Sequence, residues 1–176
     1  MNAARDARRP ARPPAPALPD FETLDRTHAA ALEMLVAFER LLDHLEAGNR
    51  DDSAASSARA ILEFFGGPGR DHHAQEERQV FPGLLTSSDA ELVHAVKRLQ
   101  QDHGWIEEDW RELSPQIEAI AAGYNWYDLP MLRAALPVFT ALYHEHISLE
   151  ESLIYPVAKR QAQALKDAAE ARQQAG

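Results

Sequence analysis

One short pattern occurs twice in this chain and limits its fold more than any other feature. A histidine is followed four residues later by a glutamate, then by a second glutamate at +5, an aromatic residue at +9 and a proline at +10. The copies begin at His72 and His146. Residues four apart on an α-helix share a face, so His72 with Glu76, and His146 with Glu150, should each point at one place. One such pair is common by chance, but two with matching aromatic and proline positions indicate a repeated unit.

The duplication extends upstream of both copies. His28 lies 44 residues before His72, and His103 lies 43 residues before His146. We therefore predict the all-α class, as an antiparallel up-down four-helix bundle of two pseudo-repeated helical hairpins. Docking the hairpins would gather four histidines and two glutamates in the interior. Because buried polar groups are costly without partners, the cluster favours a metal site over polar groups that pair only among themselves.

Hydrophobic periodicity and capping residues place the helices. We expect helices at about 21–47, from 52 or 53 onward, from 88 or 89 to about 122, and after Asp128 through Glu150. A Gly/Pro cluster at 66–69 either re-aims the turn that carries His72 or is a simple surface break between helices. Prolines 115, 137 and 156 should bend their helices. The bundle is predicted at 20–160, with a disordered Arg/Pro/Ala tail at 1–19 and a frayed helical tail at 161–176.

The repeated motifs resemble the hemerythrin-like (HHE cation-binding) family over about residues 20–160. Members of that family are four-helix bundles that hold a pair of non-haem irons. The resemblance implies a cofactor of two iron ions in an oxo- or hydroxo-bridged centre. A four-His, two-Glu set resembles bacterial members and those linked to nitric-oxide stress and iron–sulfur repair. Carried over to this chain, the implied metal ligands are His28, His72, Glu76, His103, His146 and Glu150.

Other polar residues are weaker candidates. Glu77 and Glu151 recur in both copies and either hold neighbouring His or Arg groups or, as we favour, belong to solvated faces. Glu107 forms a third His-x-x-x-Glu with His103; surface exposure is favoured over metal contact. The remaining histidines are expected on the surface or behind the ligands: His44, His73, His94 and His144.

Composition excludes several classes of function. A net charge of −10 argues against a nucleic-acid-binding surface. The chain has no cysteine, which removes disulfides, thiolate catalysis and iron–sulfur ligation, and leaves donors that suit iron or manganese. No apolar run approaches the roughly 18 residues that a membrane helix needs, and no signal peptide is evident, so a cytoplasmic protein is expected.

The leading functional hypothesis is a non-haem di-iron protein that binds O2 or NO for sensing, storage or protection. An alternative is a di-iron oxidase, peroxidase or NO reductase, which would need an external electron donor and hence a reductase partner. A third is an iron-responsive interaction module, for which the aromatic loop at 124–127 either offers a contact surface or packs over the bundle end. No feature predicts the oligomeric state. The ligand pocket is expected among apolar neighbours of the site: Leu35, Ile106, Trp110, Phe139, Leu142 and Tyr143.

Overall fold

The computed structural model describes residues 18–174, and every regular element in that range is a helix. The all-α class is therefore confirmed for the described part of the chain. Most of the tail predicted at 1–19 lies outside the described residues. The elements, in order, are α1 (Phe21–Glu46), α2 (Asp52–Gly66), α3 (Pro68–Gln79), α4 (Phe81–Leu85), α5 (Ala90–Ala121), α6 (Leu129–Leu149), the π-helical segment η1 (Glu150–Ile154) and α7 (Tyr155–Gln174).

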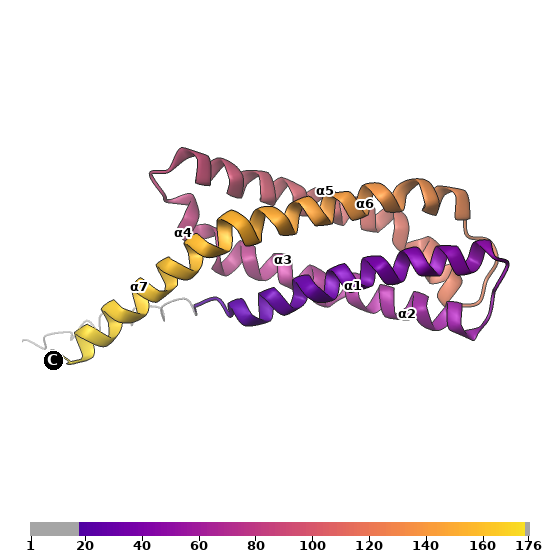
Figure 1. Ribbon diagram of the computed structural model, residues 1–176, viewed down its shortest axis with the longest axis horizontal. Coiled ribbons are helices and arrows are strands. Elements are labelled where there is room, and N and C mark those ends of the chain that lie inside the picture. Colours follow the sequence, from indigo (N-terminus) through magenta and orange to yellow (C-terminus); the bar gives the residue numbers. More distant parts are fainter. Residues whose placement is uncertain (1–17, 175–176) are drawn as a thin grey trace, which may run out of the picture.

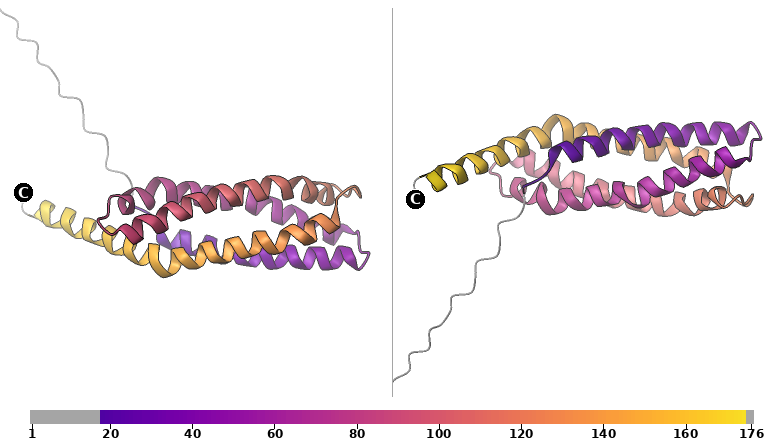
Figure 2. Two further views of the ribbon diagram at one scale, coloured as in Figure 1. Left: turned by 90° about the horizontal axis from the view of Figure 1, so that it is seen from above. Right: turned by 90° about the horizontal axis from the view of Figure 1, so that it is seen from below.

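The long helices run side by side along the long axis of the molecule (Figure 1). α2 packs on α1 and α5, and α6 packs on the same two helices, so each of the four touches two neighbours. This arrangement fits a four-helix bundle. Beyond Tyr155 the chain continues as α7, whose far end extends past the other helices (Figure 2). The tail predicted at 161–176 is thus helical as far as Gln174.

Four aspartates precede the four helices of the bundle, α1, α2, α5 and α6. Each accepts a hydrogen bond from a backbone N–H in the first turn of its helix, where that group has no partner within the helix. These N-caps are Asp20, Asp51, Asp89 and Asp128. The helix starts predicted at 21, at 52 or 53 and after Asp128 are confirmed, and α5 begins at Ala90, one or two residues later than predicted. Starts can be predicted this closely because capping depends on residues that are neighbours in the chain.

The Gly/Pro cluster at 66–69 joins two nearly continuous helices. Only Gly67 separates α2 from α3, and Pro68 takes the first position of α3, where its missing N–H does no harm. Gly69 is buried, and a Cβ there would lie 3.3 Å from the backbone oxygen of Phe64. Gly66 and Pro68 are exposed, so the cluster is a break near the surface that reaches the core at Gly69, one turn before His72.

The prolines inside the bundle affect the helices differently. α5 continues through Pro115 and α6 continues through Pro137. Before Pro156, however, five residues form π-helix, beginning with Glu150. Proline lacks an N–H and its ring clashes with the preceding turn, so a regular α-helical turn is unfavourable there. Such π segments often mark functional sites.

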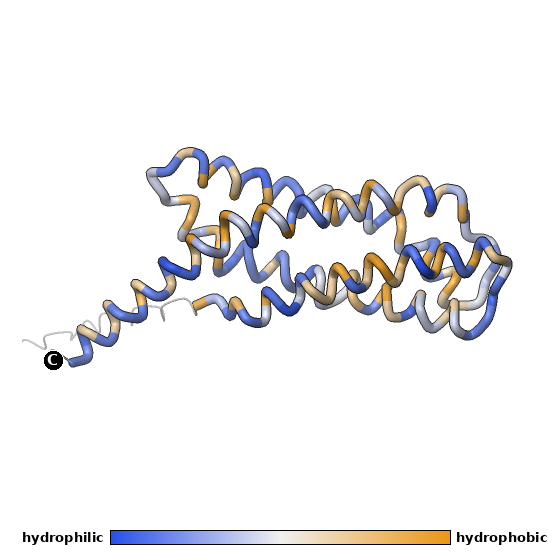
Figure 3. Tube along the Cα trace, in the orientation of Figure 1, coloured by the Kyte–Doolittle hydropathy of each residue, from blue (hydrophilic) through white to orange (hydrophobic). Residues whose placement is uncertain are grey.

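A polar layer lies between two hydrophobic clusters. The larger cluster contains Phe38, Phe65 and Phe139, and the smaller one contains Leu24 and Leu99. Along α1, Leu24 belongs to the smaller cluster and Ala31 to the larger, with His28 between them; on α5, His103 lies in the same way between Leu99 and Ile106. Figure 3 shows hydrophobic residues recurring along the bundle helices, whereas the far part of α7 is mostly hydrophilic.

None of the described helices is both long enough and apolar enough to cross a membrane.

Candidate metal centre

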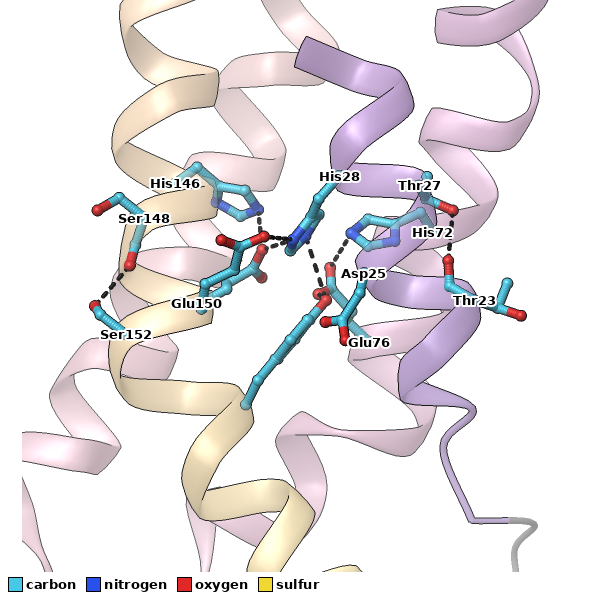
Figure 4. A network of polar contacts seen from close by, with 12 residues as sticks. Thr23, Asp25, Thr27, His28, His72, Glu76, His146, Ser148, Glu150 and Ser152 are labelled. Carbon is cyan, nitrogen blue, oxygen red and sulfur yellow. Dashed lines mark hydrogen bonds and ion pairs between the residues drawn. The ribbon is translucent and has the colours of Figure 1, made fainter. Parts of the chain in front are cut away.

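Six buried side chains meet in this polar layer, and they come from α1, α3, α5 and the junction of α6 with η1. None is more than 9% exposed, and both glutamates are fully buried. Figure 4 shows the labelled members pointing toward one another from α1, α3 and the junction of α6 with η1. The fold thus brings together all six residues that the repeats single out: His28, His72, Glu76, His103, His146 and Glu150.

Each glutamate lies between the histidine of its own motif and a histidine of another helix. Glu76 Oε2 is 3.4 Å from His72 Nε2 and 3.4 Å from His103 Nε2. Glu150 Oε2 is 3.1 Å from His28 Nε2 and 3.3 Å from His146 Nε2. The donors form two groups, each with its donor atoms within 4.8 Å of one another. Both glutamates belong to both groups; we call the place beside His28 and His72 the first position, and that beside His103 and His146 the second position.

The donor atoms fit a bound cation. Buried polar atoms in native proteins nearly always have hydrogen-bond partners. Here the ring nitrogens of His72 and His146, Nε2 of His103, and carboxylate oxygens of Glu76 and Glu150 are buried without one among the described residues. Bound cations would supply the missing partner to one nitrogen of each of these imidazoles and to the carboxylate oxygens, and imidazole with carboxylate suits iron or manganese.

Glu77 and Glu151 support the centre from behind. Glu151 Oε1 lies 3.1 Å from His28 Nδ1, and Glu77 Oε1 lies 3.2 Å from His103 Nδ1. An ionised carboxylate can only accept, so Nδ1 carries the proton and Nε2 keeps its lone pair for the centre. The interpretation of these glutamates as merely solvated is wrong, although both stay partly exposed at their outer edges.

Comparison with known proteins now decides the family. The family model described as the hemerythrin HHE cation binding domain matches residues 20–158, most of the chain. The chain belongs to this family. An uncharacterised protein of Haemophilus influenzae is 26% identical to this HHE domain protein over 133 residues, which are 76% of this chain and 75% of the relative. No solved structure matches the chain. Family and buried cluster together indicate a metal-binding protein.

Tyr155 is a site residue of the HHE domain that the sequence reasoning noted only as an aromatic position. Its hydroxyl donates a hydrogen bond of 2.5 Å to Glu76 Oε1 and lies 3.3 Å from His28 Nε2. Its ring stacks on His28 with centroids 5.2 Å apart. Phe81, the counterpart in the first repeat, stacks in the same way on His103 but has no hydroxyl. The sequence carried one signal for this role, because the residue nine positions after the histidine is phenylalanine in the first copy of the motif and tyrosine in the second.

His73 lies inside the HHE site. The prediction placed it on the surface or behind the ligands, because it lies about 100° around the helix from His72. Its ring stacks on His103, with centroids 4.3 Å apart, and lies 5.4 Å from His146, so the alternative behind the ligands holds. The surface prediction is wrong because α5 and α6 close over that side of α3. Asp102 was also missed; it is buried, and its Oδ2 lies 3.9 Å from His146 Nδ1.

The other candidates lie away from the HHE centre. Glu107 forms an ion pair of 2.8 Å with Arg70 and is 37% exposed, so the interpretation as a surface residue holds. His94 and His144 are exposed, and His44 pairs with Asp51 at the end of α1. In the loop at 124–127, Tyr124 and Trp126 are exposed, whereas Tyr127 packs against the larger cluster.

A small cavity of about 10 Å³ adjoins the centre, about the space that one water molecule needs. Four histidines line it (His28, His72, His73 and His146), together with Thr27, Ala31, Phe64, Gly69, Tyr143 and Ile147. Of the predicted pocket residues, only Tyr143 is in the lining. The prediction is wrong for the other five, which belong to the larger cluster or pack against it: Leu35, Ile106, Trp110, Phe139 and Leu142.

Burial sets the charge of the metal-free centre. It lowers the pKa of His72 to about 4, and it lowers the pKa values of His73 and His146 as well. Burial and the nearby Glu76 raise the pKa of Glu150. Burial acts in the same direction on Glu76, but the nearby ring of His103, the other imidazoles and the hydrogen bond from the Tyr155 hydroxyl outweigh it, so the pKa of Glu76 falls. Two carboxylates this close divide into one ionised and one protonated.

We expect the metal-free HHE domain to lose stability between pH 6.5 and pH 4. In that interval the three histidines bind protons in the unfolded chain but not in the folded one, so unfolding is favoured as the pH falls. His72 alone, with its pKa moved from 6.5 to about 4, would contribute about 3 kcal/mol across the interval. The raised pKa of Glu150 favours the folded state as the pH falls and so opposes this trend. It is a single group, whereas three histidines act in the destabilising direction.

Urea unfolding of chelator-treated protein at pH 7 and pH 5 measures the effect. The exposed His144 is the control site, since a His144→Asn variant should keep the full pH dependence. A free energy of unfolding that is unchanged, or higher, at pH 5 would contradict the buried neutral histidines.

Proposed function

We propose that this HHE domain holds a pair of iron ions bridged by Glu76 and Glu150, and that it reversibly binds O2 or NO there for sensing, storage or protection. The observation that carries the proposal is the pair of donor groups that share both carboxylates, with a small cavity directly against them. Bound iron would supply electrons to the small ligand; the histidines and glutamates of the chain hold and orient the two ions.

The proposal includes the up-down topology and the internal repeat. Two contacts support it: Glu151 of the second hairpin holds His28 of the first, and Glu77 of the first holds His103 of the second. If the two halves of the chain were interchanged by a two-fold rotation, each of these contacts would take the place of the other. A pseudo-two-fold axis through the centre accounts for both contacts.

The size and lining of the cavity favour a diatomic ligand over a larger substrate. Its apolar wall, formed by Ala31, Phe64 and Ile147, limits access of water to the centre. The buried Tyr143 adds one hydroxyl to this wall. A cavity of about 10 Å³ has no room for an organic substrate, so the wall selects by size. This favours reversible binding over the oxidase alternative.

The test is a ligand titration of the reduced, iron-loaded protein. We expect a visible absorption band to appear with O2 or NO and to disappear when the gas is removed. A Tyr143→Phe variant should keep its iron but release the ligand about five- to tenfold faster, the effect of one lost hydrogen bond. Continuous O2 consumption with a reductant, or no band with either gas, would contradict the proposal and favour one of the alternatives.

A further inference from the structure

Two motifs of the sequence have no part in the metal centre. The loop at 124–127, which reads Tyr-Asn-Trp-Tyr, joins α5 to α6 at one end of the bundle (Figure 1). The segment 5–16 contains four of the chain's 18 basic residues but only one of its 28 acidic residues. Its part 9–16 reads Arg-Pro-Ala-Arg-Pro-Pro-Ala-Pro and lies outside the described residues.

The loop presents two exposed aromatic rings beside a groove. Tyr124 is 58% exposed and Trp126 is 62% exposed, and their rings stack with centroids 6.1 Å apart. The adjoining groove has a volume of about 60 Å³, and Tyr124, Tyr127, Leu45 and Asp51 are among the residues that line it. Exposed tyrosine and tryptophan side chains are enriched where proteins bind partners. We call these two rings and the groove the aromatic surface.

Hydrogen bonds hold the backbone of this loop in place. At its start, the Tyr124 N–H donates to the backbone oxygen of Ala119 at 2.9 Å. At its end, the Asp128 N–H donates to Gln116 Oε1 at 2.7 Å. A fixed backbone presents the two rings in one arrangement, so a partner that binds them meets a small entropic cost.

The segment 9–16 has the chemistry that such a surface recognises. Proline-rich segments favour the extended polyproline II helix and dock on grooves lined by aromatic rings. The charges are also complementary, because residues 43–52, which border the groove, include four carboxylates and one arginine. Arg133 adds a second cation by pairing with Asp43 and Glu46, so carboxylates still outnumber arginines there. The segment 9–16 has two arginines and no acidic residue.

The length of the chain shows that a segment cannot bind the aromatic surface of its own copy. Leu45, which lines the groove, lies 24 residues after Phe21, or about 36 Å along α1. Pro13 lies only eight residues before Phe21 and can be at most about 29 Å away from it, even in a fully extended chain. The prolines at 13–16 therefore reach an aromatic surface only on another copy.

We propose that segment 9–16 of one copy binds the aromatic surface of a second copy of this chain. Its prolines lie on the rings of Tyr124 and Trp126, and its arginines face the carboxylates of Asp51 and Asp52. The start of α1 and the aromatic surface lie at opposite ends of the bundle (Figure 1). Two copies side by side in opposite directions thus bind each other's segments and form a closed two-fold dimer. This dimer requires neither a metal nor a gas ligand.

The experiment measures dimerisation of the full-length protein by analytical ultracentrifugation over a series of concentrations. We expect a dimer in wild type, and a Kd at least about tenfold higher in Trp126→Ala, because a buried tryptophan anchor carries much of the energy of such a contact. A double variant on the other side of the contact, Arg9→Glu with Arg12→Glu, should weaken the dimer in the same direction. A synthetic peptide of residues 5–17, added to wild type, should convert the dimer to monomer.

Trp105 provides the matched control, because it is 55% exposed on α5, away from the loop, and Trp105→Ala should leave the Kd unchanged. The arginine variant changes no described residue, so its result does not depend on how well Trp126→Ala folds. A wild type that stays monomeric throughout the series would overturn the inference. A dimer that keeps its Kd in Trp126→Ala or in the arginine variant, or that resists the peptide, would do so as well.

Discussion

Replacing Glu150 by leucine is expected to remove metal from both positions. Glu150 Oε2 lies within 3.3 Å of a histidine nitrogen of each group, so its loss deprives both ions of a ligand. We expect iron per chain to fall by at least about tenfold, as measured by elemental analysis after loading. The folded state should survive, because both oxygens of Glu150 are buried without hydrogen-bond partners in the described structure. Replacing such a group by an apolar one is often neutral or stabilising.

The chain offers a matched control for this substitution. Glu107 also lies four residues after a histidine, but it is partly exposed and pairs with Arg70. Glu107→Leu should therefore keep its full iron content and lose at most about 1 kcal/mol of stability. Full iron in Glu150→Leu, or lost iron in Glu107→Leu, would show that the centre is built from different residues.

Removing the metal is expected to lower the thermal stability strongly. A ligand that binds only the folded state at 100 times its Kd stabilises by about 2.7 kcal/mol, so two ions would contribute about 5 kcal/mol. For a chain of this size, that corresponds to a Tm about 10–20 °C lower in the metal-free protein. The physical reason is the set of buried donor atoms that lack partners without an ion.

Differential scanning calorimetry of metal-free and Fe²⁺-loaded protein, under anaerobic conditions, checks this expectation. The Glu150→Leu variant is the control: its Tm should hardly respond to added Fe²⁺. Identical Tm values for the two forms of the wild-type protein would mean that the cluster is satisfied without a cation.

The positions of the helices and the six central residues could be predicted from the sequence because they depend on local rules. An aspartate caps the turn that follows it, so Asp20 and Asp128 mark helix starts regardless of the rest of the fold. The four-residue spacing of His72 and Glu76 sets a shared face once the segment is helical. The repeat then supplied the partner for each motif.

The sequence was less informative about the surroundings of those residues. Hydrophobic periodicity identifies a buried face but cannot separate a cavity wall from a packed core. The predicted pocket therefore named Phe139, which packs in the larger cluster without lining the cavity, and missed Phe64 and Ile147, which line it. Whether an apolar side chain borders empty space depends on how closely its neighbours on other helices approach.

What the sequence by itself determined is the helical class, the helix ends and a duplicated set of donors that face one way. Only the tertiary structure decided the roles of His73, Asp102 and Tyr155, and that Glu77 and Glu151 hold the histidines. All five act on residues of other helices, across distances that no spacing along the chain encodes. A helical rule assigns a direction to a side chain, but the neighbouring helices determine whether that direction leads to solvent or into the centre.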